Sequence, residues 1–334
     1  MRWLRLLGLR WLRLLGLLVA AGALALAALY LWYVRGLGIR PQVVEAPGLR
    51  WTARAPLPEA RTEVTAAVLG GRIYVIGGFD GFARTTATVQ VYDPAMDRWH
   101  LGPPLPHPVH HAMAAAAFGR LFVVGGLSGV RFAPTARVFA FDGRRWTEVA
   151  PLPEPLGAAG IAVVGGRIHV VGGVGRAGDV TAHYRYDPAD NAWTRLAPLP
   201  VARDHLAAAA LAGRLYAIGG RLGGDYGRNL SRVDIYDPRT DRWEEGPALG
   251  TARSGHAAAV VEGRLVVLGG EEPGRTIAPV ELFDGRRWRA PTRLPTPRHG
   301  LAAAAVGRAV SVLAGGPRPA LSVSGLHEVL VLEE

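Results

Sequence analysis

Ile73-Tyr-Val-Ile-Gly-Gly78 is the stretch that decides the fold, because it recurs along the whole chain. Each copy is a short apolar run that ends in two glycines. The other copies begin at Leu121, Ile168, Leu215, Leu265 and Val310. Successive glycine pairs are 48, 47, 47, 50 and 46 residues apart. A period of this length is typical of a repeat architecture, in which one supersecondary unit is copied and stacked.

The unit over residues 203–249 predicts four short strands. It begins with an Ala-rich segment, and a tight turn at 213–214 leads into the apolar run and its glycines. A polar loop follows, and residues 232–236 then alternate polar and apolar side chains as a half-buried strand does. The turn at 237–238 leads to a fourth segment at Trp243. Four-stranded units in radial array form a β-propeller, in which the small Ala side chains suit the crowded axis.

Two further features recur in five of the units. An aromatic–Asp pair lies in the third segment, and a tryptophan follows five or seven residues after the aromatic residue. These tryptophans are Trp99, Trp146, Trp193, Trp243 and Trp288. A glycine pair, an aromatic–Asp pair and a Trp at this period resemble the Kelch-repeat propeller family, over about residues 51–334. The resemblance implies an all-β fold of six four-stranded Kelch blades.

The two ends of the repeat region predict how the ring closes. After the last glycine pair only one more strand fits, over 327–332, and no Trp follows it. Trp51-Thr-Ala-Arg-Ala-Pro-Leu-Pro58 precedes the first Ala-rich segment and matches the segment that begins at Trp193. We therefore expect the N-terminal strand at Trp51 to complete the sixth blade. The propeller then occupies residues 51–334, and 35–50 form a linker.

The N-terminal part has a different composition. Residues 14–34 carry no charge and are long enough to cross a bilayer as one helix. Arginines within residues 1–13 precede this run, so we expect a cytoplasmic basic segment followed by a transmembrane signal-anchor helix. The composition is typical of GC-rich bacterial genomes, which predicts a single-pass protein of the bacterial inner membrane with a periplasmic or extracellular propeller. Ala23-Leu-Ala25 leaves open a cleaved signal peptide and a secreted propeller.

Composition also excludes several functions. The formal net charge is +11, but the basic residues are spread out, and nucleic-acid binding usually needs a clustered basic stripe. The chain has no Cys, which excludes disulfides, thiolate metal sites and a galactose-oxidase-like copper centre with its Cys-linked Tyr. We expect a monomeric propeller without a cofactor and without a nucleic-acid partner.

Strand directions sort the connections onto two faces. The turns after each Ala-rich strand are short and uniform, whereas the loops after the glycine pairs vary most. These variable loops are 79–84, 127–132, 174–179, 221–229 and 271–275. Variable loops on a rigid scaffold are the usual place of function. Because the strand at Trp51 starts from the uniform face, we expect the variable face to point away from the membrane.

The candidate ligand residues lie where the first strands begin, on the variable face. Four blades place an arginine there and two have Val109 and Leu156 instead. The predicted ligand-binding set is Arg61, Arg203, Arg253, Arg298, His111, His205, His256 and His299. We expect this set to ring the channel mouth, where arginine forks suit a carboxylate or an acidic peptide. An alternative is that the arginines bracket strand ends and pair with acids of the loops.

A metal site is not expected. His107-Pro-Val-His-His111 is rich in histidine, but neighbouring residues of a strand point to opposite faces, so His110 and His111 would not converge. The sequence favours a binding module for a protein, peptide or glycan over an enzyme, because only Glu63 and Asp204 are acids beside the arginines. The alternative is a sugar-acid epimerase or mutarotase, since exported six-bladed Kelch proteins include a family that resembles N-acetylneuraminate epimerases.

Overall fold

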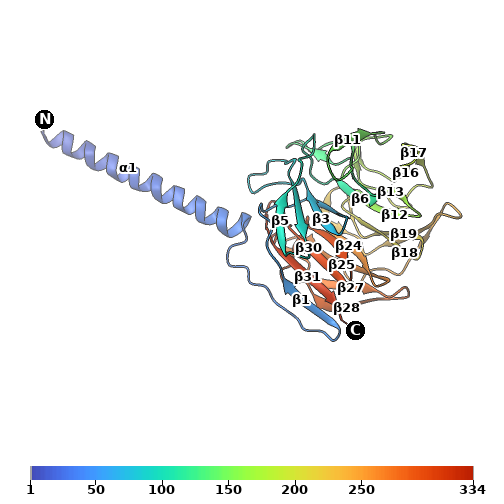
Figure 1. The fold of residues 1–334 in the computed structure, drawn as a ribbon. Helices are drawn as coiled ribbons and strands as arrows, with labels where there is room; N and C mark the ends of the chain where they lie inside the picture. The colour runs from blue at the N-terminus through green and yellow to red at the C-terminus, as the bar shows by residue number, and fades with distance from the viewer. Residues whose placement is uncertain (1, 334) are drawn as a thin grey trace.

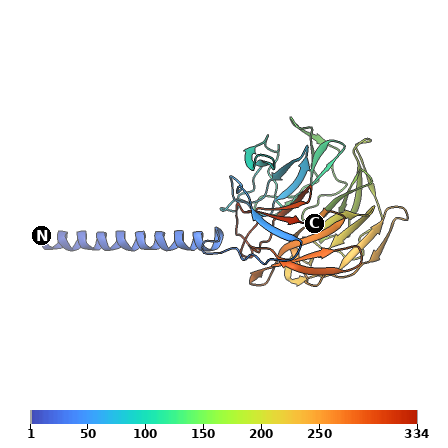
Figure 2. The ribbon, with the colours of Figure 1, turned by 60° about the horizontal axis from the view of Figure 1, so that its bottom comes forward.

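A computed structural model of the protein describes residues 2–333 and contains six four-stranded antiparallel sheets (Figures 1 and 2). Their innermost strands contact one another in a closed circle, β2–β6–β12–β18–β24–β29 and back to β2. This arrangement confirms the six-bladed propeller. A long helix, α1 (Arg2–Leu29), projects from its side and ends in a π-helical turn, η1 (Tyr30–Val34).

Five blades take their strands in chain order from the axis outward. They are β2 (Thr65–Leu69), β3 (Arg72–Ile76), β4 (Val89–Asp93) and β5 (Arg98–Leu101); β6 (Met113–Ala117), β7 (Arg120–Val124), β10 (Val138–Phe141) and β11 (Trp146–Val149); β12 (Gly160–Val164), β13 (Arg167–Val171), β16 (His183–Asp187) and β17 (Ala192–Arg195); β18 (Ala207–Leu211), β19 (Arg214–Ile218), β22 (Val233–Asp237) and β23 (Arg242–Glu245); β24 (Ser254–Val261), β25 (Arg264–Glu272), β27 (Pro279–Phe283) and β28 (Trp288–Arg293). The apolar second strands are buried on both faces because blades pack face to face.

The sixth blade combines both ends of the repeat region. From the axis outward its strands are β29 (Ala302–Val306), β30 (Ala309–Leu313), β31 (His327–Leu332) and β1 (Leu49–Ala53). Trp51 of β1 lies opposite Leu330 of β31, so the predicted closure by the N-terminal strand is confirmed. Closure removes the free sheet edges that an open array would expose.

The glycine pairs join neighbouring blades. The second glycine donates its N–H to the carbonyl where the next blade's first strand begins, as Gly78 does to Val109 at 2.8 Å and Gly220 to Arg253 at 2.9 Å. The first glycine approaches the same carbonyl so closely that a Cβ on Gly77 would lie 2.4 Å from Val109 O. The pairs therefore mark where blades touch. Positive φ angles at both residues let the backbone approach the carbonyl of the next blade.

In the sixth blade the pair is shifted by one residue from the predicted Gly315-Gly316. Ala314 donates to Leu326 O and Gly315 to Arg61 O, which are the bonds that the two glycines make in other blades. Ala314 accordingly has φ 57° and Gly315 has φ 89°. Alanine therefore fills a position that glycine fills elsewhere. The last Gly-Gly pair in the sequence lies one residue beyond the equivalent position in the other blades.

Two faces of the ring carry different connections. The turn face holds the short β2–β3, β4–β5 and equivalent turns. The loop face holds the variable loops, of which several form small ribbons: β8 (Leu127–Ser128) with β9 (Ala133–Pro134), β14 (Val174–Gly175) with β15 (Gly178–Asp179), β20 (Arg221–Leu222) with β21 (Asp225–Asn229), and the end of β25 with β26 (Arg275–Thr276). The loop face is therefore built from protruding arms around the channel.

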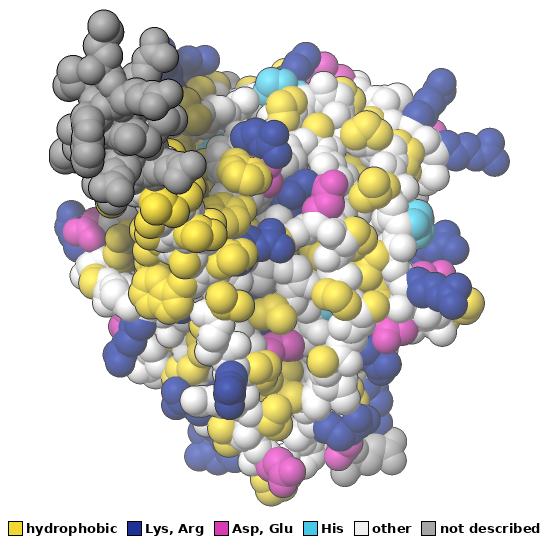
Figure 3. Space-filling model, turned by 90° about the vertical axis from the view of Figure 1, so that its left-hand side faces the viewer, with side chains coloured by type: hydrophobic (Ala, Val, Ile, Leu, Met, Phe, Trp, Pro, Cys, Tyr) yellow, Lys and Arg dark blue, Asp and Glu magenta, His cyan; other side chains and the backbone are white. Residues whose placement is uncertain are grey.

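The end of the helix packs on the loop face. Leu15–Val34 is long and apolar enough to cross a membrane, and apolar side chains are prominent on the side of the molecule from which the helix projects (Figure 3). Tyr30 stacks on Phe82 of a variable loop with ring centroids 5.4 Å apart, and Arg318 lies over the ring of Trp32. Residues 35–48 then run past the end of β28, the outer strand of the fifth blade, to β1. The helix thus ends at the loop face, and not at the uniform face on which the expected orientation toward the membrane was based, because residues 35–48 carry the chain back to the start of β1.

Two buried histidines make stability depend on pH. His183 donates from Nδ1 to Ala197 O at 2.9 Å, and its Nε2 lies 3.0 Å from His169 Nδ1. Burial lowers the pKa of His183 to about 4 and that of His169 to about 3. The unfolded chain binds these protons near pH 6.5 and the folded chain does not, so stability is complete above pH 7 and is lost as pH falls toward 4.

We therefore expect His183→Gln to weaken the pH dependence of stability. The difference in free energy of unfolding between pH 7 and pH 5 should shrink by about 2 kcal/mol, because one buried histidine contributes roughly 1.4 kcal/mol per pH unit below pH 6.5. Urea unfolding at the two pH values measures this. His100→Gln, which removes an exposed histidine, should leave the difference unchanged. An equal effect of both variants would contradict the assignment.

Candidate functional site

A ring of six residues surrounds the channel where it opens on the loop face. Each blade contributes one residue with φ between 50° and 60° at or just before the start of its first strand. The members of this mouth ring are Glu63, His111, Ala158, His205, Gly255 and Gly300. From His111 to Gly300, the N–H of each member donates to the carbonyl of the preceding member at 2.8–3.1 Å, and Val64, the neighbour of Glu63, closes the circle by donating to Gly300 O at 3.3 Å. The backbone is thereby held rigidly at the mouth.

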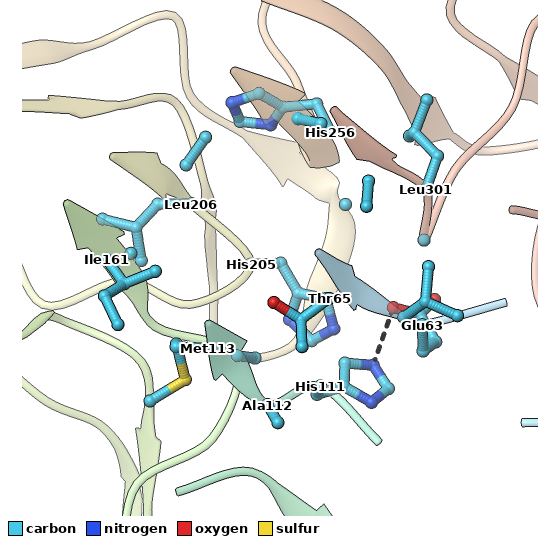
Figure 4. Close-up of a pocket in the computed structure, with 18 of the residues that line it drawn as sticks. Glu63, Thr65, His111, Ala112, Met113, Ile161, His205, Leu206, His256 and Leu301 are labelled. Carbon is cyan, nitrogen blue, oxygen red and sulfur yellow. Dashed lines mark ion pairs between the residues drawn. The ribbon is translucent and has the colours of Figure 1, made fainter. Parts of the chain in front are cut away.

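Three members of the mouth ring carry functional side chains. Glu63, His111 and His205 converge over a cavity of about 180 Å³ (Figure 4). The other three members carry at most a methyl group, which leaves room for the side chains of Glu63, His111 and His205. Ala-rich first strands line the cavity below. The site is therefore a narrow channel lined mainly by small residues, with one cluster of polar side chains at its entrance.

Glu63 is the centre of the cluster. Its Oε2 lies 3.1 Å from His111 Nε2 and its Oε1 lies 3.2 Å from His299 Nδ1. Burial favours the neutral acid, but the neighbouring histidines outweigh it and hold the pKa of Glu63 well below its usual range. Burial lowers the pKa of His111 well below its ordinary value. His299 is also buried, yet Glu63 and Glu271 raise its pKa above the ordinary value.

A second group of charges supports His205. Its Nδ1 contacts the fully buried Asp204, and its Nε2 lies 2.9 Å from an Nη of Arg221. Arg221 also pairs with Asp204 at 3.0 Å and with Glu271 at 3.2 Å. The pKa of Asp204 is lowered despite its burial, because it accepts from His205 and lies beside Arg221. Glu63, Asp204 and Glu271 thus lie together at the mouth, and the guanidinium group of Arg221 pairs with the last two.

The predicted arginines do not reach the mouth. Arg203, Arg253 and Arg298 are fully buried inside their blades, where they pair with Asp234, Glu281 and Glu328. Arg61 pairs with Glu59. Other donors of the three buried arginines bond to backbone carbonyls, as Arg298 Nε does to Ala314 O at 2.8 Å. The guanidinium groups thus bracket strand ends, as in the alternative interpretation, but Asp234, Glu281 and Glu328 belong to the third strands of their blades and not to loops.

The predicted histidines divide into three positions. His111 and His205 belong to the mouth ring, and His299 lies behind Glu63. His256 lines the cavity, but its ring turns toward Gly219 and away from the cluster (Figure 4). Ligand binding by the arginines and by these histidines remains a prediction.

His110 and His111 converge, contrary to the expectation from strand alternation. Their Nδ1 atoms are 2.5 Å apart. The reason is that His111 has φ 51° and is not yet part of β6, so the alternation of a regular strand does not apply. His111 also joins residues of other blades, which local spacing does not reveal.

Two residues of the cluster were missed. Glu271 and Arg221 each follow a glycine pair directly, at the base of a variable loop. This shared position at the start of a loop is the feature of the sequence that could have identified them. The mouth ring also recurs in the sequence. Each of its members lies two residues after the position that carries the recurring arginine, which is occupied by Arg61, Val109, Leu156, Arg203, Arg253 and Arg298.

Comparison with known proteins agrees with this architecture. Residues 103–270, just over half of the chain, match the family model of the KLHDC2/KLHL20/DRC7 Kelch-repeats domain, and residues 60–106 match the Kelch motif. The solved structure of YjhT is similar with a TM-score of 0.71 and 15% sequence identity, over 82% of this chain and 95% of that one. At this identity the similarity concerns the fold. No curated protein sequence matches the chain.

Proposed function

Because this chain belongs to the Kelch-repeat β-propeller family, we propose that it is a membrane-tethered, exported binding module. Its ligand, a protein, peptide or glycan, binds over the channel mouth on the loop face. The helix Leu15–Val34 serves as a single-pass anchor in a bacterial inner membrane, with the N-terminus in the cytoplasm and the propeller in the periplasm or outside the cell. Kelch propellers are typically protein-binding modules, which supports this role.

The observation that carries the proposal is that all protruding ribbons and the polar cluster share one face. Loops that project from a rigid ring provide a large adaptable surface, and the cluster provides a fixed polar contact at its centre. The end of the helix packs on the same face through Tyr30 and Phe82. The bound ligand therefore lies close to the membrane surface.

The charges at the mouth favour a particular ligand chemistry. Glu63, Asp204 and Glu271 outnumber Arg221, so the mouth suits hydroxyl, amide or cationic groups better than an anion. A sugar-acid epimerase would need a cation free to hold the substrate carboxylate, and the four arginines of the register are engaged inside the blades. This supports the binding role over the enzymatic alternative, with His111 and His205 as the proposed ligand contacts.

Substitutions on the two faces test the proposal. In the full-length protein, Val130→Ser, Arg176→Ala and Arg228→Ala together change three exposed loop tips. The matched control combines Met96→Ser, Arg144→Ala and Arg286→Ala on three exposed tips of the turn face. We expect crosslinking of intact cells followed by mass spectrometry to recover a ligand with the wild type. Recovery should fall about tenfold with the loop-face variant, a change of about 1.4 kcal/mol.

The control variant should recover that ligand as well as the wild type does. Equal recovery from all three proteins, or a loss confined to the turn-face variant, would contradict binding on the loop face. Correct folding of both variants is established beforehand by their thermal unfolding in detergent.

A further inference from the structure

We propose that Glu63, His111 and His205 bind one divalent transition-metal ion at the channel mouth. One Glu63 carboxylate oxygen, His111 Nε2 and His205 Nε2 would be the ligands. Within residues 2–333, one potential ligand atom from each of these residues lies within 4.8 Å of the other two. The inference does not depend on the binding role proposed above.

The fold brings these side chains together from three blades. They project from equivalent positions of the mouth ring, whose backbone is held by the circle of hydrogen bonds. Glu63 Oε2 and His111 Nε2 are already 3.1 Å apart, close to the separation of two ligands on one tetrahedral ion with bonds of about 2.0 Å. Ala158, Gly255 and Gly300 complete the ring without polar side chains. Coordination positions therefore remain open toward the channel, as in catalytic rather than structural sites.

The hydrogen bonds of His110 determine the tautomer of His111. The carbonyl of Gly129 can only accept, so His110 Nε2, 3.3 Å away, donates to it. A neutral His110 then accepts at Nδ1, and His111 Nδ1 must be the donor in the 2.5 Å contact between the two rings.

This tautomer leaves His111 with a lone pair on Nε2 that faces a carboxylate. Two acceptors 3.1 Å apart repel each other unless a cation lies between them. Both side chains are largely withdrawn from solvent, with exposures of 6% for His111 and 13% for Glu63. A metal ion bound by both atoms resolves this conflict.

His205 is prepared as a ligand in the same way. Its Nδ1 contacts a carboxylate oxygen of Asp204, an arrangement in which Nδ1 carries the proton and Nε2 is the electron-pair donor. A carboxylate behind a histidine is the usual partner that orients a metal ligand. Arg221 now donates to Nε2 at 2.9 Å. It would give up this contact when an ion binds, and would keep its pairs with Asp204 and Glu271.

The donor set defines the class of ion. Two imidazole nitrogens and one carboxylate oxygen suit Zn²⁺ or Fe²⁺, whereas Mg²⁺ and Ca²⁺ prefer oxygen ligands alone. Zn²⁺ is the appropriate first probe because it has no redox chemistry. Co²⁺ can replace it as a spectroscopic probe, because its visible absorption reports nitrogen coordination and low coordination number.

Metal titration of the full-length protein in detergent tests the proposal after chelator treatment. We expect one Zn²⁺ per chain, with the melting temperature raised by roughly 5 °C or more at 100 times the Kd. His111→Asn and His205→Asn should each weaken Zn²⁺ binding at least about 100-fold, because even outer partners of metal ligands are worth 10–100-fold. Asparagine is chosen because it tolerates the positive φ of the mouth ring. His100→Asn, which removes an exposed histidine, should bind Zn²⁺ as the wild type does.

Two further variants keep the result interpretable. Glu63→Gln preserves the size of the side chain and should lose Zn²⁺ even if a histidine variant proves unstable. Arg221→Gln removes a positive charge and the competing donor, so it should bind Zn²⁺ more tightly than the wild type. Absence of Zn²⁺ binding above the level of the His111→Asn variant, unchanged affinity of Glu63→Gln, or weaker binding by Arg221→Gln would each overturn the proposed site.

Discussion

Trp51→Ala is expected to lower the free energy of unfolding by about 3–5 kcal/mol, the usual cost of removing a large buried aromatic side chain. The indole packs in a core cluster between the fifth and sixth blades with Leu268, Val280 and Leu330. Its Nε1 donates to Thr292 Oγ1 at 3.1 Å, and Thr292 Oγ1 in turn donates to Val44 O. The substitution therefore weakens both β1 and the segment that leads to it.

This loss is large because it affects the closure of the ring. A typical domain is stable by about 5–15 kcal/mol, so the variant loses a large share of its stability. Trp146→Ala is the matched control, since Trp146 lies on the outer strand of a blade made from one continuous stretch of chain and is more exposed. Thermal and urea unfolding should show a clearly smaller loss for the control. Unchanged unfolding of Trp51→Ala would contradict the role of β1 in closure.

Local sequence patterns were sufficient to predict the ring. In five blades the glycine pair has the same chemical cause, because a Cβ on its first residue would strike the carbonyl of the next blade. The pattern therefore repeats wherever blades touch, and the number of blades and the closing strand follow from it. The shift at Ala314 shows the limit of this reasoning, because a residue other than glycine can adopt positive φ when its surroundings enforce it.

The site was predicted less completely than the fold. Glu63, His111 and His205 are separated by more than 40 residues in sequence and meet only because the ring is closed. Their direction depends on a left-handed backbone conformation that strand periodicity cannot anticipate. The arginines were placed at the correct strand ends, but the acids that attract them lie on the third strands of the blades, as Glu281 does on β27.

Arg253→Met is the substitution with the other large expected effect, a loss of about 3–5 kcal/mol in the free energy of unfolding. Arg253 Nη2 lies 2.7 Å from Glu281 Oε1, with both side chains almost completely buried. The same guanidinium donates to Gly269 O at 3.0 Å and to Pro279 O at 3.1 Å. Methionine fills similar space but leaves a buried carboxylate without its counterion, which is the costly state.

Two comparisons separate this role from a role in ligand binding. Arg167→Met breaks the more exposed pair with Asp187 on the turn face and should cost no more than about 1 kcal/mol. Arg253→Met combined with Glu281→Gln should be more stable than Arg253→Met alone, because the unpaired charge is gone. Urea unfolding midpoints measure all three variants. If Arg253→Met left the midpoint unchanged, the arginine would not hold the blade, and binding of an anion at this position would again become the better explanation for its recurrence.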